Sequence, residues 1–181
     1  LGLEENTILI FMTDNGTSGG AGGPKGFNAG MRGRKGSLFD GGHRVPCFVR
    51  WPAGHMTGGR DVDRLTAHLD LLPTLVDLCG LECPADFHPE GKSIAPLLRG
   101  EAKDWHDRTL FVQYRQSTDP PVKGHAAVMT ERWRLISGKA LFDIGADPGQ
   151  KRDVAAEHPQ VVERLRGEYE RWWAGVSKRF G

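Results

Sequence analysis

TILIFMTDNG, residues 7–16, is the stretch that decides the fold. Residues 7–13 form a short apolar run that predicts a buried strand, parallel to its neighbours and covered on both faces. The run ends in a polar turn at residues 14–16. Ligands in open α/β sheets gather at the carboxyl ends of strands, so this turn is a candidate site.

Two side chains of this turn, Asp14 and Asn15, offer hard oxygen ligands of the kind that Ca²⁺ and Mg²⁺ prefer. Adjacent ligands after a strand can both reach one ion if the turn redirects the second. Taken alone, Asp-Asn-Gly is more often an ordinary turn, because Asn and Asp bond readily to their own backbone. The metal site therefore needs support from elsewhere in the chain.

A glycine-dense loop follows at residues 17–36, without helical or strand periodicity. A loop of this length is usually functional or mobile, and its small residues let backbone approach a ligand closely. Lys35 near its end is a point charge suited to an anionic oxygen. The alternative for Lys35, and the preferred interpretation for Arg32 and Arg34, is a solvated loop cation.

The remaining pattern changes along the chain. We expect a strand at 45–51 and a helix within 65–78 that Asp70 caps, with Pro73 in its first turn and Gly80 after its end. Beyond a proline-containing connector, short strands joined by short loops predict an antiparallel sheet at 110–114, 126–129, 133–136 and 140–143. An amphipathic helix is expected from His158 to about Ser177. The predicted class is α/β, with one domain at 1–105 and a second at 106–181.

Bulk composition excludes several classes. The chain has 181 residues with 38% hydrophobic residues and a formal net charge of +1, a globular balance that favours neither nucleic acid nor acidic partners. No apolar run is long enough to span a membrane. The three cysteines (Cys47, Cys79 and Cys83) are interpreted as buried thiols, although a bridge between the last two is an alternative. Since the chain opens on Leu1, we expect it to continue a longer protein.

Several motifs occur together in a fixed order: TILIFMTDNG, then RGRKGSLFDGGHRVPCFVRWPAG at 32–54, then AHLDLLPTLVDLCGL at 67–81. This order resembles the formylglycine-dependent (type I) sulfatases of the alkaline-phosphatase superfamily, and is arylsulfatase-like. The resemblance continues through residues 91–93, 96–100, 133–136 and 141–148, so it covers nearly the whole chain. It implies the late part of an alkaline-phosphatase-like mixed sheet with flanking helices, followed by the small antiparallel sheet and helix.

The resemblance also assigns roles to residues of this chain. Asp14 and Asn15 match the family's late pair of metal ligands, for Ca²⁺ with Mg²⁺ as the alternative. Lys35 matches the lysine that contacts the sulfate group. Arg44, in the G-G-x-R-x-P turn, is expected to support the site. His68 is a weaker candidate for substrate binding, and a packed or exposed histidine is the preferred alternative.

The family's nucleophile is a formylglycine made from Cys or Ser in a C/S-x-P/A-x-R motif, and no such motif occurs in these residues. The resemblance therefore implies that the nucleophile and the earlier metal ligands belong to an N-terminal half of the same polypeptide. The present chain is expected to be a C-terminal fragment, inactive alone and prone to aggregate or fold only in part. Its family relatives make a periplasmic or secreted location the expectation.

The predicted function is that of a sulfuric ester hydrolase acting on a sulfate-ester substrate. One alternative is a phosphonate monoester or phosphodiester hydrolase of the same superfamily, which shares the sheet and the metal chemistry. The other is a non-catalytic binding module, if the chain is complete. Activity on a sulfate against a phosphorus ester distinguishes the first two.

Overall fold

A computed structural model describes residues 1–18, 26–102, 105–114 and 120–179. The chain packs into two compact units. The ribbon unit consists of Leu1–Met12 and Cys47–Asp107, and the sheet unit consists of Thr13–Pro46 and Arg108–Gly181. Residues 13–46, which lie between the two strands of the ribbon in sequence, therefore belong to the same unit as the C-terminal strands. The predicted division into domains at residue 105 stays a prediction.

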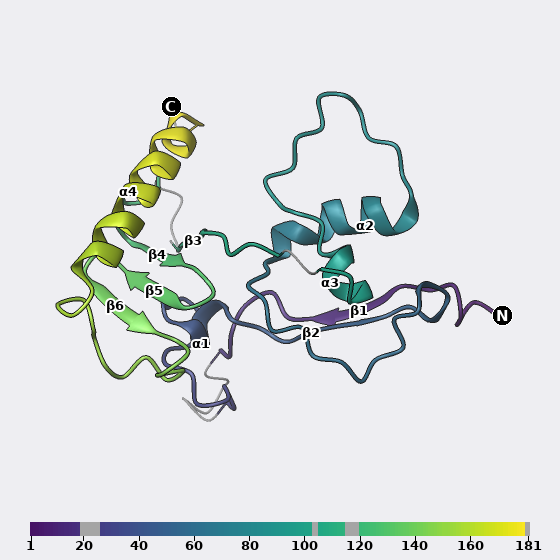
Figure 1. Cartoon of the computed structure of the whole chain (residues 1–181), viewed down its shortest axis with the longest axis horizontal. Helices are drawn as coiled ribbons and strands as arrows, with labels where there is room; N and C mark the ends of the chain where they lie inside the picture. The colour runs from purple at the N-terminus through teal and green to yellow at the C-terminus, as the bar shows by residue number, and fades with distance from the viewer. Residues whose placement is uncertain (19–25, 103–104, 115–119, 180–181) are drawn as a thin grey trace. The chain divides into compact units, whose positions relative to one another are not determined.

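The ribbon unit is built on two strands, β1 (Leu9–Met12) and β2 (Cys47–Arg50), which pair antiparallel with Leu9 opposite Arg50 (Figure 1). The expected parallel strand covered on both faces is wrong within this chain. Its partner here is β2, which returns in the opposite direction after the loop. The side chains of Leu9, Phe11 and Phe48 are 57%, 62% and 65% exposed, so one face of the ribbon is open.

Helices cover part of the ribbon unit: η1 (Pro52–Gly54), η2 (His68–Asp70), α2 (Leu71–Cys79) and α3 (Ala95–Arg99). They enclose a small core of Met56, Leu78 and Ala95, against which Ile8, Val49, Trp51 and Leu98 pack. Gly80 ends α2 in the left-handed conformation, as predicted. Asp70 does not cap α2 through its side chain. It is buried, and its carboxylate accepts bonds from the amides of Ala67 (2.7 Å) and Lys92 (2.9 Å).

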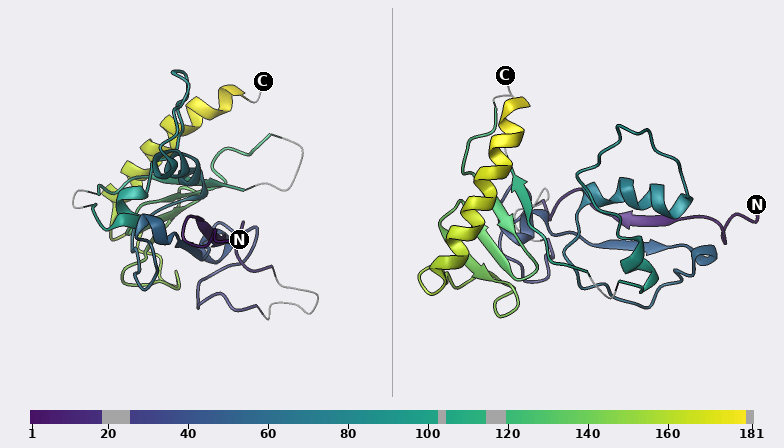
Figure 2. Two further views of the ribbon diagram at one scale, coloured as in Figure 1. Left: turned by 90° about the vertical axis from the view of Figure 1, so that its right-hand side faces the viewer. Right: turned by 45° about the horizontal axis from the view of Figure 1, so that its top comes forward.

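The sheet unit contains four antiparallel strands in the order β3 (Leu110–Gln113), β4 (Ala126–Met129), β5 (Trp133–Ile136) and β6 (Ala140–Asp143). The expected antiparallel sheet is confirmed. The helix α4 (Pro159–Val176) follows, continued by η3 (Ser177–Arg179), and runs across the strands (Figure 1). In the right-hand view of Figure 2, α4 passes in front of the green strands. The core between them consists of Ala126, Val128, Trp133, Leu135, Leu141, Val154, Val162, Leu165 and Tyr169.

The face of this sheet away from α4 is buried as well. Successive side chains of a strand point to opposite faces, so Arg134 and Phe142 lie on the face that Leu135 and Leu141 do not share. Phe142 packs edge-on against Phe39 with 5.9 Å between ring centroids. Arg134 is 5% exposed because the short helix α1 (Asp40–His43) and the loop before it cover this face.

The three cysteines carry free thiols, but they are exposed and not buried as expected. Among the described residues, no helix has both the length and the apolar character that a membrane crossing requires.

Candidate functional site

The turn after β1 holds the two predicted metal ligands side by side. Asn15 donates a hydrogen bond from Nδ2 to Oδ2 of Asp14, and Thr13 Oγ1 donates to the carbonyl of Asn15 at 3.2 Å. Asp14 is exposed and Asn15 is half-buried. A carboxylate and an amide thus meet at the surface of the sheet unit.

Two backbone hydrogen bonds bring this turn to the later part of the loop. The amide of Gly16 donates to the carbonyl of Gly42 at 3.0 Å, and the amide of Lys35 donates to the carbonyl of Thr17 at 2.9 Å. Lys35, which is exposed, therefore lies in a loop segment that is hydrogen-bonded to the residues just after the Asp14–Asn15 turn. The two parts of the predicted site are neighbours in space, although twenty residues separate them in sequence.

Glycine is required where these backbones meet. A Cβ atom at Gly16 would overlap the carbonyl oxygen of Gly41. A Cβ atom at Gly41 would overlap the carbonyl oxygen of Gly33, and one at Gly42 would overlap that of Ser37. The Gly-Gly pair of the G-G-x-R-x-P turn thus serves close packing of the loop on itself, which fixes the position of the turn that carries Asn15.

Arg44 is held by Asp40, the first residue of α1. The amide of Arg44 donates to the carbonyl of Asp40 at 2.7 Å, and its Nη1 lies 3.7 Å from Asp40 Oδ2. The Arg44 side chain is 53% exposed, whereas that of Asp40 is 1% exposed. Arg44 therefore presents a cation at the surface from an anchored position, and its supporting role stays a prediction.

Asp40 also forms an ion pair with the sheet, which sequence reasoning missed. Arg134 donates from Nε to Asp40 Oδ1 at 2.9 Å, and Gln150 Oε1 accepts a bond from the Asp40 amide at 2.8 Å. Arg32, interpreted from sequence as a solvated cation, donates from Nη1 to the Gln150 carbonyl at 3.0 Å and lies 3.9 Å from the centre of the Phe39 ring. A charged residue in the middle of a short apolar strand, Arg134 in Trp-Arg-Leu-Ile, was the available signal.

His43 ends α1 within the same network. One ring nitrogen, Nε2, lies 3.2 Å from the carbonyl of Leu38. Burial lowers the pKa of His43 below its usual 6.5, since desolvation of the imidazolium outweighs the attraction of Asp40. The nearby Arg134 cation acts in the same direction as burial. His43 is therefore favoured in its neutral form near pH 7.

Tyr114, another residue that the sequence did not indicate, packs against Gly36, which follows Lys35. Gly36 has φ of +85°, and a Cβ atom there would lie 2.9 Å from the Tyr114 hydroxyl oxygen. The aromatic ring therefore lies against the backbone of the residue that follows Lys35.

The chemistry of Asp14 and Asn15 fits Ca²⁺ or Mg²⁺. The Asp14 carboxylate and the Asn15 amide carbonyl both offer oxygen ligands, which these ions prefer. They supply only two ligands, while Ca²⁺ takes six to eight. In the part of the chain that the structure describes, no group of three or more His, Cys, Asp or Glu side chains could hold a metal ion.

His68, the remaining candidate, is exposed and begins η2 in the ribbon unit, whereas Asp14, Asn15, Lys35 and Arg44 all belong to the sheet unit. Its role stays a prediction.

Comparison with known families agrees with the order of motifs in the chain. The family model for the C-terminal part of N-sulphoglucosamine sulphohydrolase matches residues 34–172, which include Lys35, the α1 turn and the whole C-terminal sheet. The chain belongs to this sulfatase family. The predicted sulfatase resemblance is thereby confirmed.

Sulfatases are also among its relatives. Steryl-sulfatase of Mus musculus is 32% identical over 203 residues, which cover 91% of this chain and 32% of the relative. Arylsulfatase A of Homo sapiens is 35% identical over 170 residues, which cover 91% of this chain and 32% of the relative. The chain thus spans about a third of the length of these relatives.

Solved structures share the fold. A structure of a 2-O GAG sulfatase matches with a TM-score of 0.70 and 25% identity, covering 98% of this chain and 38% of that one. The phosphonate monoester hydrolase of Agrobacterium radiobacter matches with a TM-score of 0.55 and 28% identity, covering 75% of this chain and 32% of that one. The expected α/β fold is confirmed, and the sulfatase match is the more complete.

Proposed function

We propose that this chain is the C-terminal part of a sulfuric ester hydrolase and carries part of its metal and sulfate site. The observation that supports the proposal most is the meeting of the Asp14–Asn15 turn with the Lys35 backbone in a chain of the sulfatase family. The hydrolysis itself belongs to the whole polypeptide.

Each candidate residue has a distinct role in this proposal. Asp14 and Asn15 hold the metal, which we propose to be Ca²⁺, and Lys35 binds an oxygen of the sulfate group through its ammonium. Arg44 supports the site as an anchored cation, and His68 is a weaker candidate for substrate contact, with an exposed histidine as the preferred alternative. When present, the metal ion would supply a Lewis acid and a formylglycine would supply the nucleophile. Lys35 would stabilise the negative charge that grows on the sulfate oxygens during transfer.

The N-terminal half of the same polypeptide is the proposed partner of the ribbon. The open face formed by Leu9, Phe11 and Phe48 supports this, because soluble proteins rarely leave such side chains together without a function. The relatives offer about two thirds of their length outside the matched region. That length is sufficient to cover the ribbon and to bring the remaining metal ligands.

The test uses the complete natural polypeptide that contains this chain, assayed with 4-nitrophenyl sulfate and with a phenylphosphonate monoester. We expect hydrolysis of the sulfate ester, reduced on the order of a hundredfold or more by Lys35→Ala, since loss of one group that stabilises developing charge has this effect. Lys139→Ala, which removes another exposed lysine of the sheet unit, should leave the rate unchanged.

Metal binding gives a readout besides activity. Calorimetric titration with Ca²⁺ should show a site that Asp14→Ala weakens at least tenfold and that Glu163→Ala, a change at an exposed carboxylate of α4, does not. Preference for the phosphonate ester would replace the proposal by the phosphorus-ester alternative, which the Agrobacterium radiobacter likeness favours. No hydrolysis of either ester would leave the binding-module alternative.

A further inference from the structure

A buried ion pair joins the loop of the candidate site to the C-terminal sheet. Asp40 on α1 is fully buried and Arg134 on β5 is 5% exposed, with 2.9 Å between Oδ1 and Nε. The guanidinium also donates to the carbonyls of Thr130 and Trp133, the latter at 3.1 Å. Bonds within the β4–β5 hairpin therefore hold the Arg134 side chain in addition to its contact with the loop.

Stability alone is a poor explanation for such a pair. Taking two charges out of water costs several kcal/mol for each ion, and apolar replacements of buried pairs are often neutral or stabilising. The best-attested use of a buried pair is to specify one arrangement over others. The neighbouring contact of Phe39 with Phe142 holds the same surfaces together without any charge.

The bonds around Asp40 lead directly to the candidate site. Asp40 precedes Gly41 and Gly42, and the Gly42 carbonyl accepts the bond from the amide of Gly16, next to Asn15. Because a Cβ atom at Gly16 would overlap Gly41, the two backbones have no slack between them. A displacement of Asp40 would therefore also displace the Asp14–Asn15 turn.

A second set of hydrogen bonds holds the part of the loop that precedes Lys35. The amide of Gly41 donates to the carbonyl of Arg32 at 2.8 Å, and Arg32 donates to the Gln150 carbonyl at 3.0 Å. The side chain of Gln150, which is fully buried, then accepts the bond from the Asp40 amide. Arg32, three residues before Lys35, is thus held by the backbone next to Asp40 and by the loop after β6.

The second oxygen of the carboxylate faces the surface cation. Asp40 Oδ2 is buried, has no hydrogen-bond partner among the described residues, and lies 3.7 Å from Nη1 of Arg44. One carboxylate thus lies between a buried and an exposed guanidinium.

From these contacts we propose that the Asp40–Arg134 pair positions the site: the C-terminal sheet, through Arg134, fixes the loop that carries Asn15 and Lys35 and orients Arg44. Asp40 and Arg134 are positioning residues that do not touch substrate or metal. The inference rests on the proposed function for its catalytic consequence, but the ordering of the loop is a property of the chain itself.

The experiment compares Arg134→Met with Leu135→Ala in the complete natural polypeptide. Leu135 is the next residue of the same strand, is fully buried and faces α4, so Leu135→Ala weakens the sheet without touching Asp40. All assays run far enough below the melting temperature of every variant that each is folded. Arg132→Met, which breaks the exposed pair with Asp143 beside the same strand, controls for loss of an arginine.

Two readouts separate positioning from stability. The first is amide hydrogen exchange at Gly16 and Lys35, whose bonds to Gly42 and Thr17 report the loop directly. We expect Arg134→Met to accelerate exchange at both amides at least tenfold, while Leu135→Ala and Arg132→Met leave it near the wild-type rate. The second is hydrolysis of 4-nitrophenyl sulfate, in which kcat should fall on the order of a hundredfold with KM changed less than threefold, since small misplacements have effects of this size.

Rescue distinguishes the charge from the packing. Arg134→Lys keeps the cation and should recover at least part of the lost protection and of kcat. If Arg134→Met does not fold, the paired variant Asp40→Asn with Arg134→Met carries the test, because it leaves no unpaired buried charge.

Equal exchange at Gly16 and Lys35 in Arg134→Met and Leu135→Ala would overturn the inference, whatever the enzyme's activity. A wild-type protein that hydrolyses no sulfate ester would instead refute the proposed function. In that case the exchange rates still decide whether the pair fixes the loop.

Discussion

The two units of this chain bury their strands very differently. In the sheet unit every residue of β5 is buried, with α4 on one face and the α1 loop on the other. In the ribbon unit Phe11 and Phe48 of the paired strands are 62% and 65% exposed. The more apolar sequence, residues 7–13, is thus the less buried one.

The difference shows that burial depends on the number of strands and on cover for both faces. Four strands with layers on either side form a unit with its own core, whereas an isolated two-stranded pair is marginal in water. The sheet unit obtains its second layer from residues 13–46, which are inserted between the two strands of the ribbon. Among the described residues of the ribbon unit, no equivalent layer covers Leu9, Phe11 and Phe48.

The largest expected effect compares Leu141→Ala with Phe11→Ala, each measured by urea unfolding in the chain alone and in the complete polypeptide. Leu141 is fully buried, so its truncation should cost about 2–5 kcal/mol of unfolding free energy in both. Phe11→Ala should cost about 0.5 kcal/mol or less in the chain alone. It should approach the cost of a core truncation only in the complete polypeptide. An equal cost of Phe11→Ala in the chain alone and in the complete polypeptide would contradict this difference between the two units.

A second contrast concerns glycines of the sheet unit. Gly41→Ala should destabilise by about 1–3 kcal/mol, because the methyl group would overlap the Gly33 carbonyl and backbone must move. Gly167→Ala, within α4, should stabilise by roughly 0.5–1 kcal/mol, since its nearest contact is an ordinary 3.6 Å from Arg171 and Ala favours the helix. Thermal unfolding measures both. A neutral Gly41→Ala would show that the loop does not pack tightly on itself.

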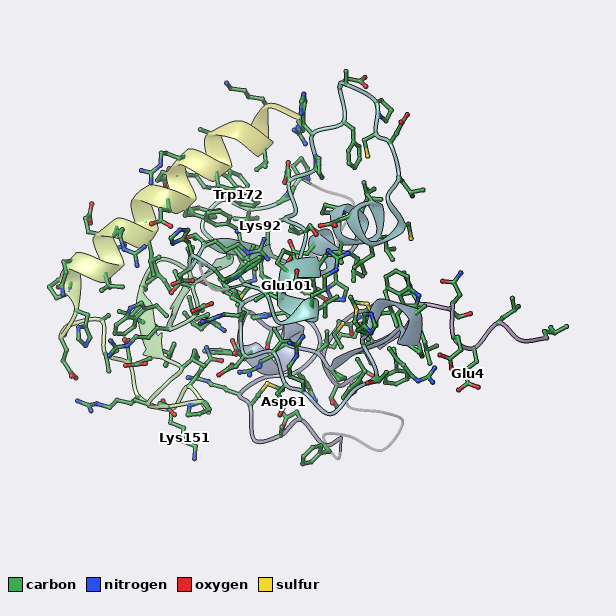
Figure 3. The ribbon with its side chains drawn as sticks, turned by 45° about the vertical axis from the view of Figure 1, so that its right-hand side comes forward. Glu4, Asp61, Lys92, Glu101, Lys151 and Trp172 are labelled. Atoms are coloured by element: carbon green, nitrogen blue, oxygen red, sulfur yellow. The ribbon has the colours of Figure 1, made fainter. Side chains whose placement is uncertain are left out.

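Aromatic pairs provide a smaller contrast. Trp172 (labelled in Figure 3) stacks on Phe111 with 4.8 Å between ring centroids, whereas Phe11 and Phe48 lie 6.2 Å apart on the open ribbon. Trp172→Ala should cost about 1.5 kcal/mol, including the aromatic pairing, because both rings are only partly buried. Phe48→Ala in the chain alone should have no measurable cost. Equal losses would indicate that the ribbon face is covered after all.

The smallest expected effect is the pH dependence contributed by His43. Its pKa is lowered in the folded state, so the unfolded chain binds more protons once the pH falls below about 6.5. Stability from this group is full above 6.5 and is lost as the pH falls toward the folded pKa. His43→Gln should flatten the slope of unfolding free energy between pH 7 and 5.

Asp143 gives the reference for this measurement. Arg132 lowers the pKa of Asp143 below its usual 3.8, so its contribution is lost only at more acidic pH. Asp143→Asn should therefore leave the slope between pH 7 and 5 unchanged. An unchanged slope in His43→Gln would show that folding does not lower the pKa of His43.

The C-terminal half of the fold was predictable because its signals are local. Alternating apolar residues and close turns indicated strands at 126–129, 133–136 and 140–143, and the structure has these bounds. The helix was predicted nearly to its ends, from His158 to about Ser177 against Pro159–Val176 in the structure. The direction and exposure of β1 were wrong, because the partner of a strand depends on contacts far away in sequence.

The candidate site was predictable in part for the same reason. The order of motifs identified Asp14, Asn15 and Lys35, and their roles stay predictions. The residues that anchor the loop were missed, since Asp40 meets Arg134 across 94 positions and Gln150 across 110. Neither separation leaves a pattern that periodicity can reveal.

The insertion of residues 13–46 between two strands of another unit also affects the order of synthesis. Gln150 follows Asp40 by 110 residues, which corresponds to roughly 5–20 s of translation. During that interval the candidate metal turn exists without the sheet that it packs on, while β1 and β2 can already pair. A ribosome that stalls before β5, or a truncation after Asp107, would therefore leave an intact ribbon with its loop unanchored.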